Sequence, residues 1–346
     1  MRLGIIGLPG SGKTTIFQTL THDRGEKTEI EKMGLRVAVV RVPDSRLEIL
    51  SKLYRPQKTI YAQLEYVLPL VKASHGREEK AKEESWGPIR DCDALIHVVR
   101  NFQGPGGYLP DPQADLVKLE SELIFSDLVS VEKRLERLEA DRKRGKRINE
   151  EELSLLNLCL KLLEGEIPLR KDPDLAASPL LKGYSFLSAK PILVLFNNAD
   201  EDDELPRGIE SWAKENGLVV RGKLEMELTQ LEEGADEFLK EYGIRTSAVE
   251  RIIRRSYDIL GLISFFTVGD NEVRSWSIKR GSTVLEAADM IHSDFKKGFI
   301  RAEVVSFTDL VECGSYHQAR KGGKIRMQGK NYHVQDGDVI RIHFKV

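Results

Sequence analysis

Residues 7–14 read Gly7-Leu8-Pro9-Gly10-Ser11-Gly12-Lys13-Thr14, which matches the spacing G-x4-G-K-[ST] at every fixed position. An apolar stretch, Leu3–Ile6, precedes it, and a helical pattern begins near Lys13. A strand, a glycine-rich turn and a helix in this order form a loop whose backbone N–H groups point at phosphate oxygens. We therefore expect Lys13 to reach the β- and γ-phosphates of a nucleotide and the Thr14 hydroxyl to ligate Mg²⁺. The other residues expected to contact the nucleotide here are Pro9, Gly10, Ser11, Gly12 and Thr15.

Five further apolar runs follow, at residues 37–42, 64–68, 94–99, 191–196 and 218–220, each bounded by polar residues, Gly or Pro. Runs of this kind are typical of parallel strands buried on both faces, and helical patterns lie between several of them. The sequence therefore predicts an α/β fold, with the doubly wound sheet of a P-loop NTPase.

A different pattern interrupts this sheet between residues 111 and 185. Apolar residues spaced 4, 3, 4 and 3 apart predict one long helix, and a second seam predicts another: Ile124, Leu128, Val131, Leu135, Leu138, then Leu153, Leu156, Leu160, Leu163. Two such helices joined by a short turn form an antiparallel helical hairpin, which either protrudes or folds down on the domain surface. The turn carries five positive charges around Gly145. They are either a solvated turn or candidate RNA contacts: Arg142, Lys143, Arg144, Lys146 and Arg147.

The last 84 residues have a third texture. Ile263–Val268 and Val273–Ile278 alternate like the strands of a hairpin, and Thr283 precedes Glu286 at the spacing of a capping box. Another strand at 300–306 and a pair at 332–334 and 339–344 predict a small mixed sheet with one packed helix, similar to a β-grasp fold. We therefore expect a nucleotide-binding domain at 1–110 and 186–262, a helical insertion at 111–185 and a C-terminal domain at 263–346.

A P-loop alone does not separate a GTPase from an ATPase or a small-molecule kinase. The predicted strand at 191–196 ends in Asn197-Asn198-Ala199-Asp200, which has the form of an N-x-x-D motif for base recognition. In that motif the carboxylate accepts two N–H groups of guanine. Asn198 replaces the usual lysine, and the register is open, because Asn198 to Glu201 fits N-x-x-E equally well.

Several stretches together resemble the YchF (Obg-like ATPase) family. They are Gly7–Thr15, Val42–Leu47, Asp93–Arg100, Ala189–Asp202, Ser256–Leu262 and, in the C-terminal part, 265–304 and 335–338. The resemblance implies a G domain, an inserted coiled-coil arm and a C-terminal β-grasp (TGS) domain. It also implies ATP in preference to GTP and association with the translation machinery, and it places Lys223 in the loop at the base edge.

The departures from that family concern hydrolysis. The family carries D-x-A-G after its third strand, whereas residues 64–72 contain neither Asp nor Gly. Glu65 is either a poor substitute or an ordinary carboxylate at the strand end. The loop 103–108 lacks the family's proposed catalytic histidine, and Thr28 is the best candidate for the switch I threonine. Without a Mg²⁺ aspartate and a water-orienting residue, phosphoryl transfer should be slow.

Composition limits the remaining options. Of the chain's 346 residues, 40% are hydrophobic and 31% are charged, and apolar runs such as Pro191–Phe196 are far too short to cross a bilayer, so we expect neither a disordered nor a membrane-spanning polymer. The three cysteines form no C-x-x-C pattern, which argues against structural zinc and disulfides. We therefore expect a cytoplasmic protein that binds ATP or GTP with Mg²⁺ and acts with the ribosome or structured RNA, without a membrane or evident DNA specificity. A nucleotide-gated module without catalysis, a nucleotide-independent scaffold and a small-molecule phosphotransferase remain alternatives.

Overall fold

The computed structural model describes residues 1–22, 29–32, 34–70, 86–209, 217–229 and 246–345. The chain divides into two compact units. The first unit contains Met1–Val40 and Glu65–Arg255, and the second unit contains Arg41–Leu64 and Ser256–Val346. Among the described residues, no helix combines the length and the apolarity that crossing a bilayer requires.

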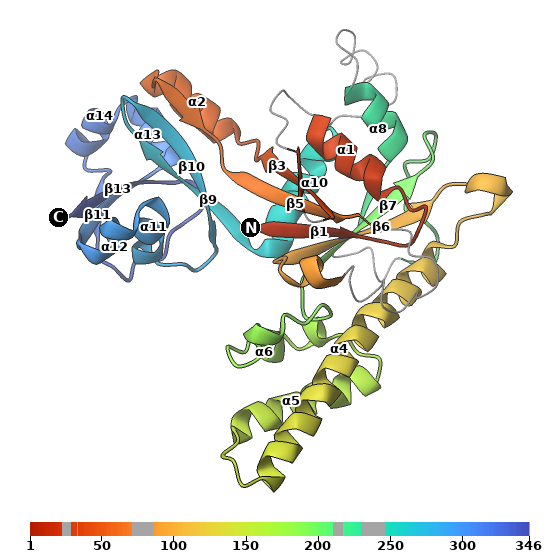
Figure 1. Cartoon of the computed structure of the whole chain (residues 1–346). Helices are drawn as coiled ribbons and strands as arrows, with labels where there is room; N and C mark the ends of the chain where they lie inside the picture. Colours follow the sequence, from red (N-terminus) through yellow and green to blue (C-terminus); the bar gives the residue numbers. More distant parts are fainter. Residues whose placement is uncertain (23–28, 33, 71–85, 210–216, 230–245, 346) are drawn as a thin grey trace. The chain divides into compact units, whose positions relative to one another are not determined.

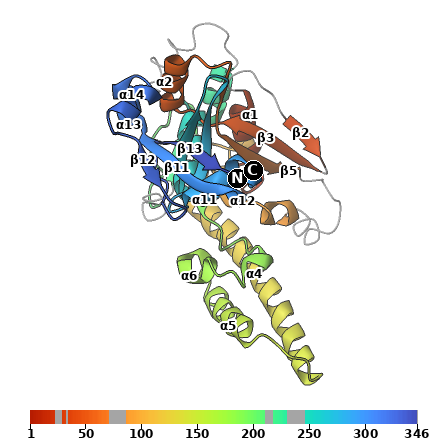
Figure 2. The same ribbon diagram turned by 90° about the vertical axis from the view of Figure 1, so that its left-hand side faces the viewer.

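A seven-stranded sheet in the order β2-β3-β5-β1-β6-β7-β8 forms the centre of the first unit. Its strands are β1 (Arg2–Ile6), β2 (Glu29–Lys32), β3 (Leu35–Arg41), β5 (Gln63–Pro69), β6 (Ala94–Asn101), β7 (Ile192–Asn198) and β8 (Gly217–Val220). β1 pairs in parallel with β5 and β6, and β7 pairs in parallel with β6 and β8. All six strands predicted for this sheet are present. β2, which was not predicted, pairs antiparallel with β3 at the edge of the sheet (Figure 2).

Helices lie on both faces of this sheet. α1 (Lys13–His22) lies on one side and α4 (Pro112–Lys143) on the other (Figure 1). Leu119 and Leu123 of α4 are buried against Ile6 and Leu95 of the central strands. α8 (Gly222–Thr229) and α10 (Ala248–Leu260) follow β8 in the chain. Burial on both faces explains the nearly continuous apolar runs of β6 and β7.

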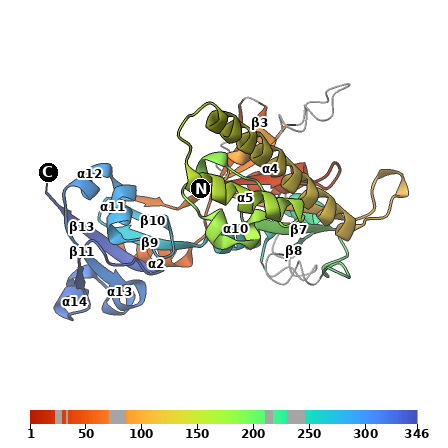
Figure 3. The ribbon, with the colours of Figure 1, turned by 90° about the horizontal axis from the view of Figure 1, so that it is seen from below.

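The predicted helical hairpin is confirmed. α4 has 32 residues, and α5 (Glu150–Glu164) lies beside its second half (Figure 3). Val131 and Leu138 of α4 pack against Leu156, Cys159 and Leu163 of α5, so the hairpin has a core of its own. That core also includes residues from the 3₁₀ turn η2 (Leu169–Lys171) and from α6 (Pro173–Ala176). The remaining short turns are η1 (Pro105–Gly107) and η3 (Lys182–Tyr184).

The second unit contains a six-stranded sheet in the order β12-β11-β13-β9-β10-β4. The strands are β4 (Lys58–Ile60), β9 (Leu262–Val268), β10 (Glu272–Lys279), β11 (Phe299–Ser306), β12 (Arg326–Gln328) and β13 (Asp338–Phe344). The hairpin of β9 and β10 and the capping box at Thr283 are confirmed. The predicted strand at 332–334 is wrong. Only an isolated bridge from His333 to Thr283 is found there, and β13 pairs with β11 instead.

Helices cover both faces of the second sheet, where one helix was predicted. α11 (Val284–Ile291) and α12 (Ser293–Lys297) lie on one side (Figure 3). α2 (Ser45–Tyr54), α13 (Phe307–Cys313) and α14 (Tyr316–Lys321) lie on the other. Neighbouring residues of β9 point to opposite faces, because Phe265 packs in the core with α11 and Phe266 packs in the core with α2.

The domain boundaries expected from the sequence put residues 41–64 in the nucleotide-binding domain, and the structure places them elsewhere. They belong to the second unit, because β4 pairs with β10 and because Leu47 and Leu50 of α2 are fully buried in its core. Arg46 strengthens this association. Its guanidinium forms ion pairs of 2.8 Å with both Asp44 and Asp336 and lies over the Phe266 ring. The sequence analysis misplaced residues 41–64 because β4 pairs with β10, more than 200 residues later in the chain, and no local pattern reveals such a pairing.

Candidate nucleotide-binding site

The loop between β1 and α1 requires its glycines. Gly10 and Gly12 have φ angles of 77° and 93°, in the left-handed region that side chains disfavour. A Cβ atom at Gly12 would lie 2.1 Å from the Asn197 side-chain amide. A Cβ atom at Gly7 would lie 2.4 Å from the Val98 carbonyl oxygen. The loop therefore packs closely on the ends of the two neighbouring strands, β6 and β7.

Lys13 closes this loop from inside. Its ammonium donates hydrogen bonds of 2.9 Å to the carbonyl oxygens of Gly7 and Leu8. Burial lowers the pKa of this lysine from its usual range. A cation held on the loop backbone and partly removed from water favours an anionic ligand, because a phosphate oxygen would restore the lost solvation.

Asn197, at the end of β7, joins the loop to a second one. Its amide nitrogen donates to the Ser11 carbonyl oxygen at 3.1 Å, and its amide oxygen accepts from the Gly222 N–H at 3.0 Å. Asn198 contacts a different set of groups, the Glu204 carbonyl oxygen and the Asn101 side chain. Because successive strand residues alternate in direction, only one of the two asparagines can bridge the loops. The geometry therefore favours the register Asn197-x-x-Asp200.

The side chain of Asp200, which follows β7, contacts the first turn of α8. One carboxylate oxygen accepts the Leu224 N–H at 3.2 Å, and the other is 3.8 Å from the Lys223 ammonium. The carboxylate thus satisfies a backbone donor in the first turn of a helix, where negative charge is stabilising. Asn197 at the end of β7, Asp200 just after it and Lys223 in the first turn of α8 therefore lie together beside the P-loop. Asn198 is the exception.

Glu65 is excluded as a magnesium ligand at this loop. It pairs in register with Arg2 on the parallel strand β1, and its carboxylate is 2.7 Å from the Arg2 guanidinium. The P-loop follows the opposite end of β1, about 16 Å away at roughly 3.3 Å per residue. The alternative interpretation, a carboxylate at the strand end, is confirmed. Thr28, the switch I candidate, lies outside the described residues.

The donors in the loop fit a phosphate group. The Ser11 hydroxyl is buried and has no hydrogen-bond partner, so an ordinary donor is left unused inside the loop. Thr14 is exposed in the first turn of α1. Within the described part of the chain, no three His, Cys, Asp or Glu side chains come together as metal ligands. The residues present therefore fit a phosphate that carries its own Mg²⁺, with Thr14 as the available protein ligand.

The chain is similar to known proteins over nearly its whole length. Residues 262–345 match the family model YchF-GTPase_C, described as "Protein of unknown function (DUF933)". The chain is 36% identical to the Ribosome-binding ATPase YchF of Bacillus subtilis over 99% of both proteins. It is 35% identical to the protein of the same name from Haemophilus influenzae over 100% of this chain and 99% of that one. The chain belongs to the YchF family.

A solved YchF structure has the same fold. The Schizosaccharomyces pombe YchF GTPase superposes with a TM-score of 0.82 at 28% identity, over 99% of this chain and 97% of that one. A GTP-binding protein from Pyrococcus horikoshii OT3 superposes with a TM-score of 0.59 at 20% identity, which shows a common fold. The P-loop NTPase architecture predicted from the sequence is therefore confirmed.

The sequence patterns missed one buried histidine in this YchF chain. His97 lies on β6, in register with Ile6 just before the P-loop, and is 3% exposed. Its Nε2 atom has no hydrogen-bond partner. Burial, and then the positive charges of Arg170 and Lys13, lower its pKa to about 3. The ring is therefore neutral near pH 7. A histidine within the apolar run 94–99, on a strand expected to lie in the sheet with β1, was the sequence signal that could have indicated it.

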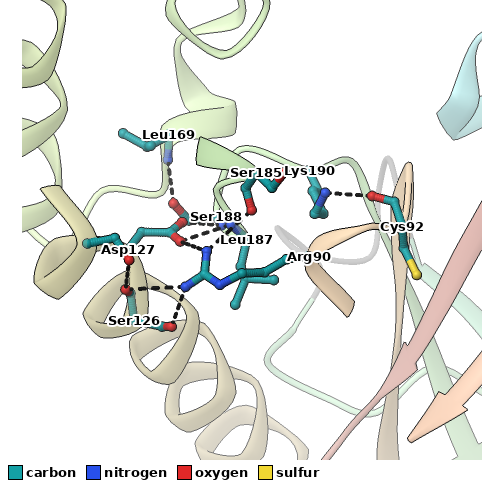
Figure 4. A network of polar contacts seen from close by, with 10 residues as sticks. Arg90, Cys92, Ser126, Asp127, Leu169, Ser185, Leu187, Ser188 and Lys190 are labelled. Atoms are coloured by element: carbon teal, nitrogen blue, oxygen red, sulfur yellow. Dashed lines mark hydrogen bonds and ion pairs between the residues drawn. The ribbon is translucent and has the colours of Figure 1, made fainter. Parts of the chain in front are cut away.

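A second missed feature anchors the helical hairpin of this YchF chain (Figure 4). Asp127 of α4 is fully buried and accepts the backbone N–H groups of Leu187 and Ser188, at 2.9 and 2.6 Å. Arg90 donates to the same carboxylate at 3.2 Å. Burial raises the pKa of Asp127, and these hydrogen bonds oppose the rise. The network fastens α4 to the segment that leads into β7.

The basic turn lies at the tip of the hairpin and begins with Arg142 and Lys143, the last two residues of α4. Three of its five cations have acidic neighbours: Arg142 pairs with Glu150 at 3.4 Å, Lys143 with Glu139 at 2.8 Å, and Lys146 with Asp141 at 2.7 Å. Arg144 and Arg147 form no ion pair with a described residue, and both are accessible to solvent. Exposed ion pairs are worth less than about 1 kcal/mol each, so a stronger anion can replace them.

Proposed function

We propose that this YchF family member binds a purine nucleoside triphosphate with Mg²⁺ and hydrolyses it slowly. The observation that carries the proposal is the glycine loop that Lys13 closes and Asn197 ties to the following loops. A loop pre-shaped in this way binds phosphate without further ordering, and the N-terminus of α1 adds a positive dipole end.

The residues take separate roles in this proposal. Backbone N–H groups of the loop and the Lys13 ammonium would neutralise and orient the phosphate oxygens. Thr14 would hold Mg²⁺, which supplies charge neutralisation to the phosphates. Asn197 keeps the loop in position through Ser11 and Gly222. None of these side chains is placed to remove a proton from water, which supports slow turnover.

We propose ATP or GTP as the nucleotide, with ATP preferred. The support is the position of Asp200, whose carboxylate already accepts the Leu224 N–H and lies near Lys223. A guanine would have to share that carboxylate with both groups. Adenine makes no such demand.

We also propose that the protein acts with the ribosome in the cytoplasm. The support is that curated relatives covering the full chain are named ribosome-binding ATPases. Two arginines at the hairpin tip are available to phosphates, and the segment from Ile263 carries 13 basic and 10 acidic residues, a net charge of +3.

Equilibrium binding of ATP, GTP, ADP and GDP, with and without Mg²⁺, tests the nucleotide proposal. Binding without multiple turnover would favour the second candidate, a nucleotide-gated module, which is supported by the lack of a general base among the described residues of the P-loop, Gly7 to Thr14. No binding of any nucleotide would contradict both. Single-turnover hydrolysis of labelled ATP distinguishes the two candidates.

Ribosome association is tested by co-sedimentation at several salt concentrations. Replacing Arg142, Lys143, Arg144, Lys146 and Arg147 with serine should weaken binding to ribosomes. If only Arg144 and Arg147 contact phosphates, the slope of log K against log salt should flatten by about 1.4 to 1.8, and if all five do, by about 3.5 to 4.5. An unchanged affinity and slope would leave the tip as a solvated turn.

A further inference from the structure

The helical hairpin carries a groove away from the nucleotide site. It has a volume of about 460 Å³ and lies between the second half of α4 and the facing side of α5. Its lining residues are Glu132, Leu135, Glu136, Leu138, Glu139, Arg142, Ile148, Leu153, Asn157 and Leu160. Along α4 the lining runs from Glu132 to Arg142, about 15 Å or three helical turns.

The two walls of this groove differ in chemistry. The floor and the α5 side are aliphatic apart from Asn157, and Leu135, Ile148, Leu153 and Leu160 remain partly accessible above the hairpin core. The α4 rim is acidic, because Glu132, Glu136 and Glu139 follow one another at helical spacing and are all exposed. An apolar strip beside a row of carboxylates is amphipathic, and it matches a partner with the opposite charge.

Two of these carboxylates lack a cation. Glu139 pairs with Lys143 at 2.8 Å, and elsewhere on the hairpin Glu150 and Glu152 pair with arginines at 3.4 and 2.8 Å. Glu132 and Glu136 form no ion pair with any described residue. Like charges four residues apart on a helix repel one another, so this pair weakens α4 unless a partner brings positive charge.

We propose that this groove binds a basic amphipathic helix of a protein partner. A third helix fits between two packed helices by placing its apolar ridge in their groove, and here its leucine-like residues would contact Leu153 and Leu160. Lysines or arginines one turn apart would reach Glu132 and Glu136. RNA is disfavoured because its phosphates would face three carboxylates. The proposal goes beyond nucleotide hydrolysis and does not depend on it.

The test uses the full chain without nucleotide and a fluorescent 14-residue helical peptide with one leucine stripe flanked by lysines. Fluorescence anisotropy should show saturable binding with one peptide per chain. A peptide of the same composition in shuffled order should bind at least about tenfold more weakly, because it presents no stripe. Equal binding of both peptides would overturn the proposal, since charge alone would then explain it.

Variants locate the site. Glu132→Gln with Glu136→Gln should weaken peptide binding about tenfold. The control, Glu151→Gln with Glu164→Gln, removes two equally exposed charges from α5 outside the groove and should stay within about twofold of the unsubstituted chain. Asn157→Trp should fill the groove and abolish binding while the melting temperature holds. Equal effects of the two double variants, binding that survives Asn157→Trp, or displacement of the peptide by a 20-nucleotide RNA would each overturn the proposal.

Discussion

The loops after β1 and after β6 follow adjacent parallel strands and lie at the same edge of the sheet, yet they are built differently. The loop after β1 is held by a distant strand, because Asn197 of β7 donates to the Ser11 carbonyl oxygen, and Lys13 at the start of α1 closes it from inside. The loop after β6 is held by its own residues and by the strand before it: the Gly104 N–H donates to the Tyr108 carbonyl oxygen at 2.9 Å, the Gln103 amide donates to the Gly107 carbonyl oxygen at 3.3 Å, and Arg100 of β6 donates to the Tyr108 carbonyl oxygen at 3.3 Å.

The difference separates nucleotide binding from hydrolysis, two functions that P-loop enzymes usually combine. The first loop presents an unused donor, the Ser11 hydroxyl, and a partly buried cation, Lys13, which is what phosphate binding needs. In the second loop, polar side chains bond to the loop's own backbone, and Tyr108 and Leu109 are 74% and 80% exposed. Affinity for nucleotide and the rate of hydrolysis should therefore respond to different substitutions.

The largest effect is expected from Lys13→Ala. Loss of the charged hydrogen bonds to two phosphates should reduce nucleotide affinity about 100-fold or more, at roughly 1.5 to 3 kcal/mol per bond. The measurement is the nucleotide-dependent shift in melting temperature. Gln103→Ala, in the loop after β6, is the control and should change affinity by less than about twofold. Unchanged nucleotide affinity in a folded Lys13→Ala protein would contradict the conclusion that the loop after β1 binds the phosphates.

A second large effect concerns pH and His97, on the strand between the two loops. Burial in the folded state lowers the pKa of His97 from its usual 6.5 to about 3, so the neutral ring is favoured. As the pH falls below about 6.5, His97 becomes protonated in the unfolded chain but stays neutral in the folded chain. The contribution of the neutral His97 ring to the free energy of unfolding is therefore present above pH 6.5 and is lost as the pH falls toward 3.

The expected loss at His97 is roughly 2 to 3 kcal/mol between pH 7 and pH 4.5, at about 1.4 kcal/mol per pKa unit. Urea denaturation at both pH values measures it. His97→Leu should reduce the acid loss by that amount, whereas His317→Gln at an exposed position should not. Equal acid sensitivity of His97→Leu and the unsubstituted chain would refute the assignment.

An intermediate effect is expected from Asn197→Ala. The substitution leaves the Gly222 N–H without its partner and frees the Ser11 end of the loop. Stability should fall by about 2 kcal/mol, and nucleotide affinity should fall about tenfold because the loop is less ordered. Asn198→Ala removes an equal number of side-chain hydrogen bonds and should leave nucleotide affinity unchanged. Calorimetric titration of both variants decides whether Asn197 is the bridging residue.

The smallest effect is expected from Asp200→Ala. Loss of the acceptor for Leu224 should cost about 1 kcal/mol of stability. ATP affinity should change by less than about twofold, and GTP affinity by no more than threefold. Competition between the two nucleotides in one assay measures this. A drop of about 30-fold for GTP alone would show that Asp200 reads guanine, and the proposed preference for ATP would then be wrong.

Local patterns carried most of what the sequence predicts correctly. The P-loop, the strands around it and the helical hairpin each follow from spacing over a few residues, so periodicity suffices. The choice between Asn197 and Asn198 could not be made in this way, because it depends on a contact with Gly222, 25 residues later. Glu65 shows the same limit, since only the pairing with Arg2 reveals which end of the sheet it occupies.

The second unit is less predictable for a similar reason. Tyr332–Val334 alternates like a strand, but β13 pairs with β11 and β9, and the alternation of residues 332–334 reflects one isolated bridge instead. Three of the helices there have seven residues or fewer, too short for a clear periodic signal. The buried charge on Asp127 was missed because its partners, Leu187 and Ser188, are about 60 residues away.

The separation of residues 41–64 from the rest of their unit has a consequence for biosynthesis. Leu47 and Leu50 leave the ribosome about 200 residues before β9 and β10, against which they are finally buried. During that interval, α2 has no core to join and its apolar face needs protection. A fragment beginning at residue 262 would lack β4 and α2, and a fragment ending at residue 255 would display them without a partner. Useful truncations should therefore carry 41–64 together with the C-terminal segment.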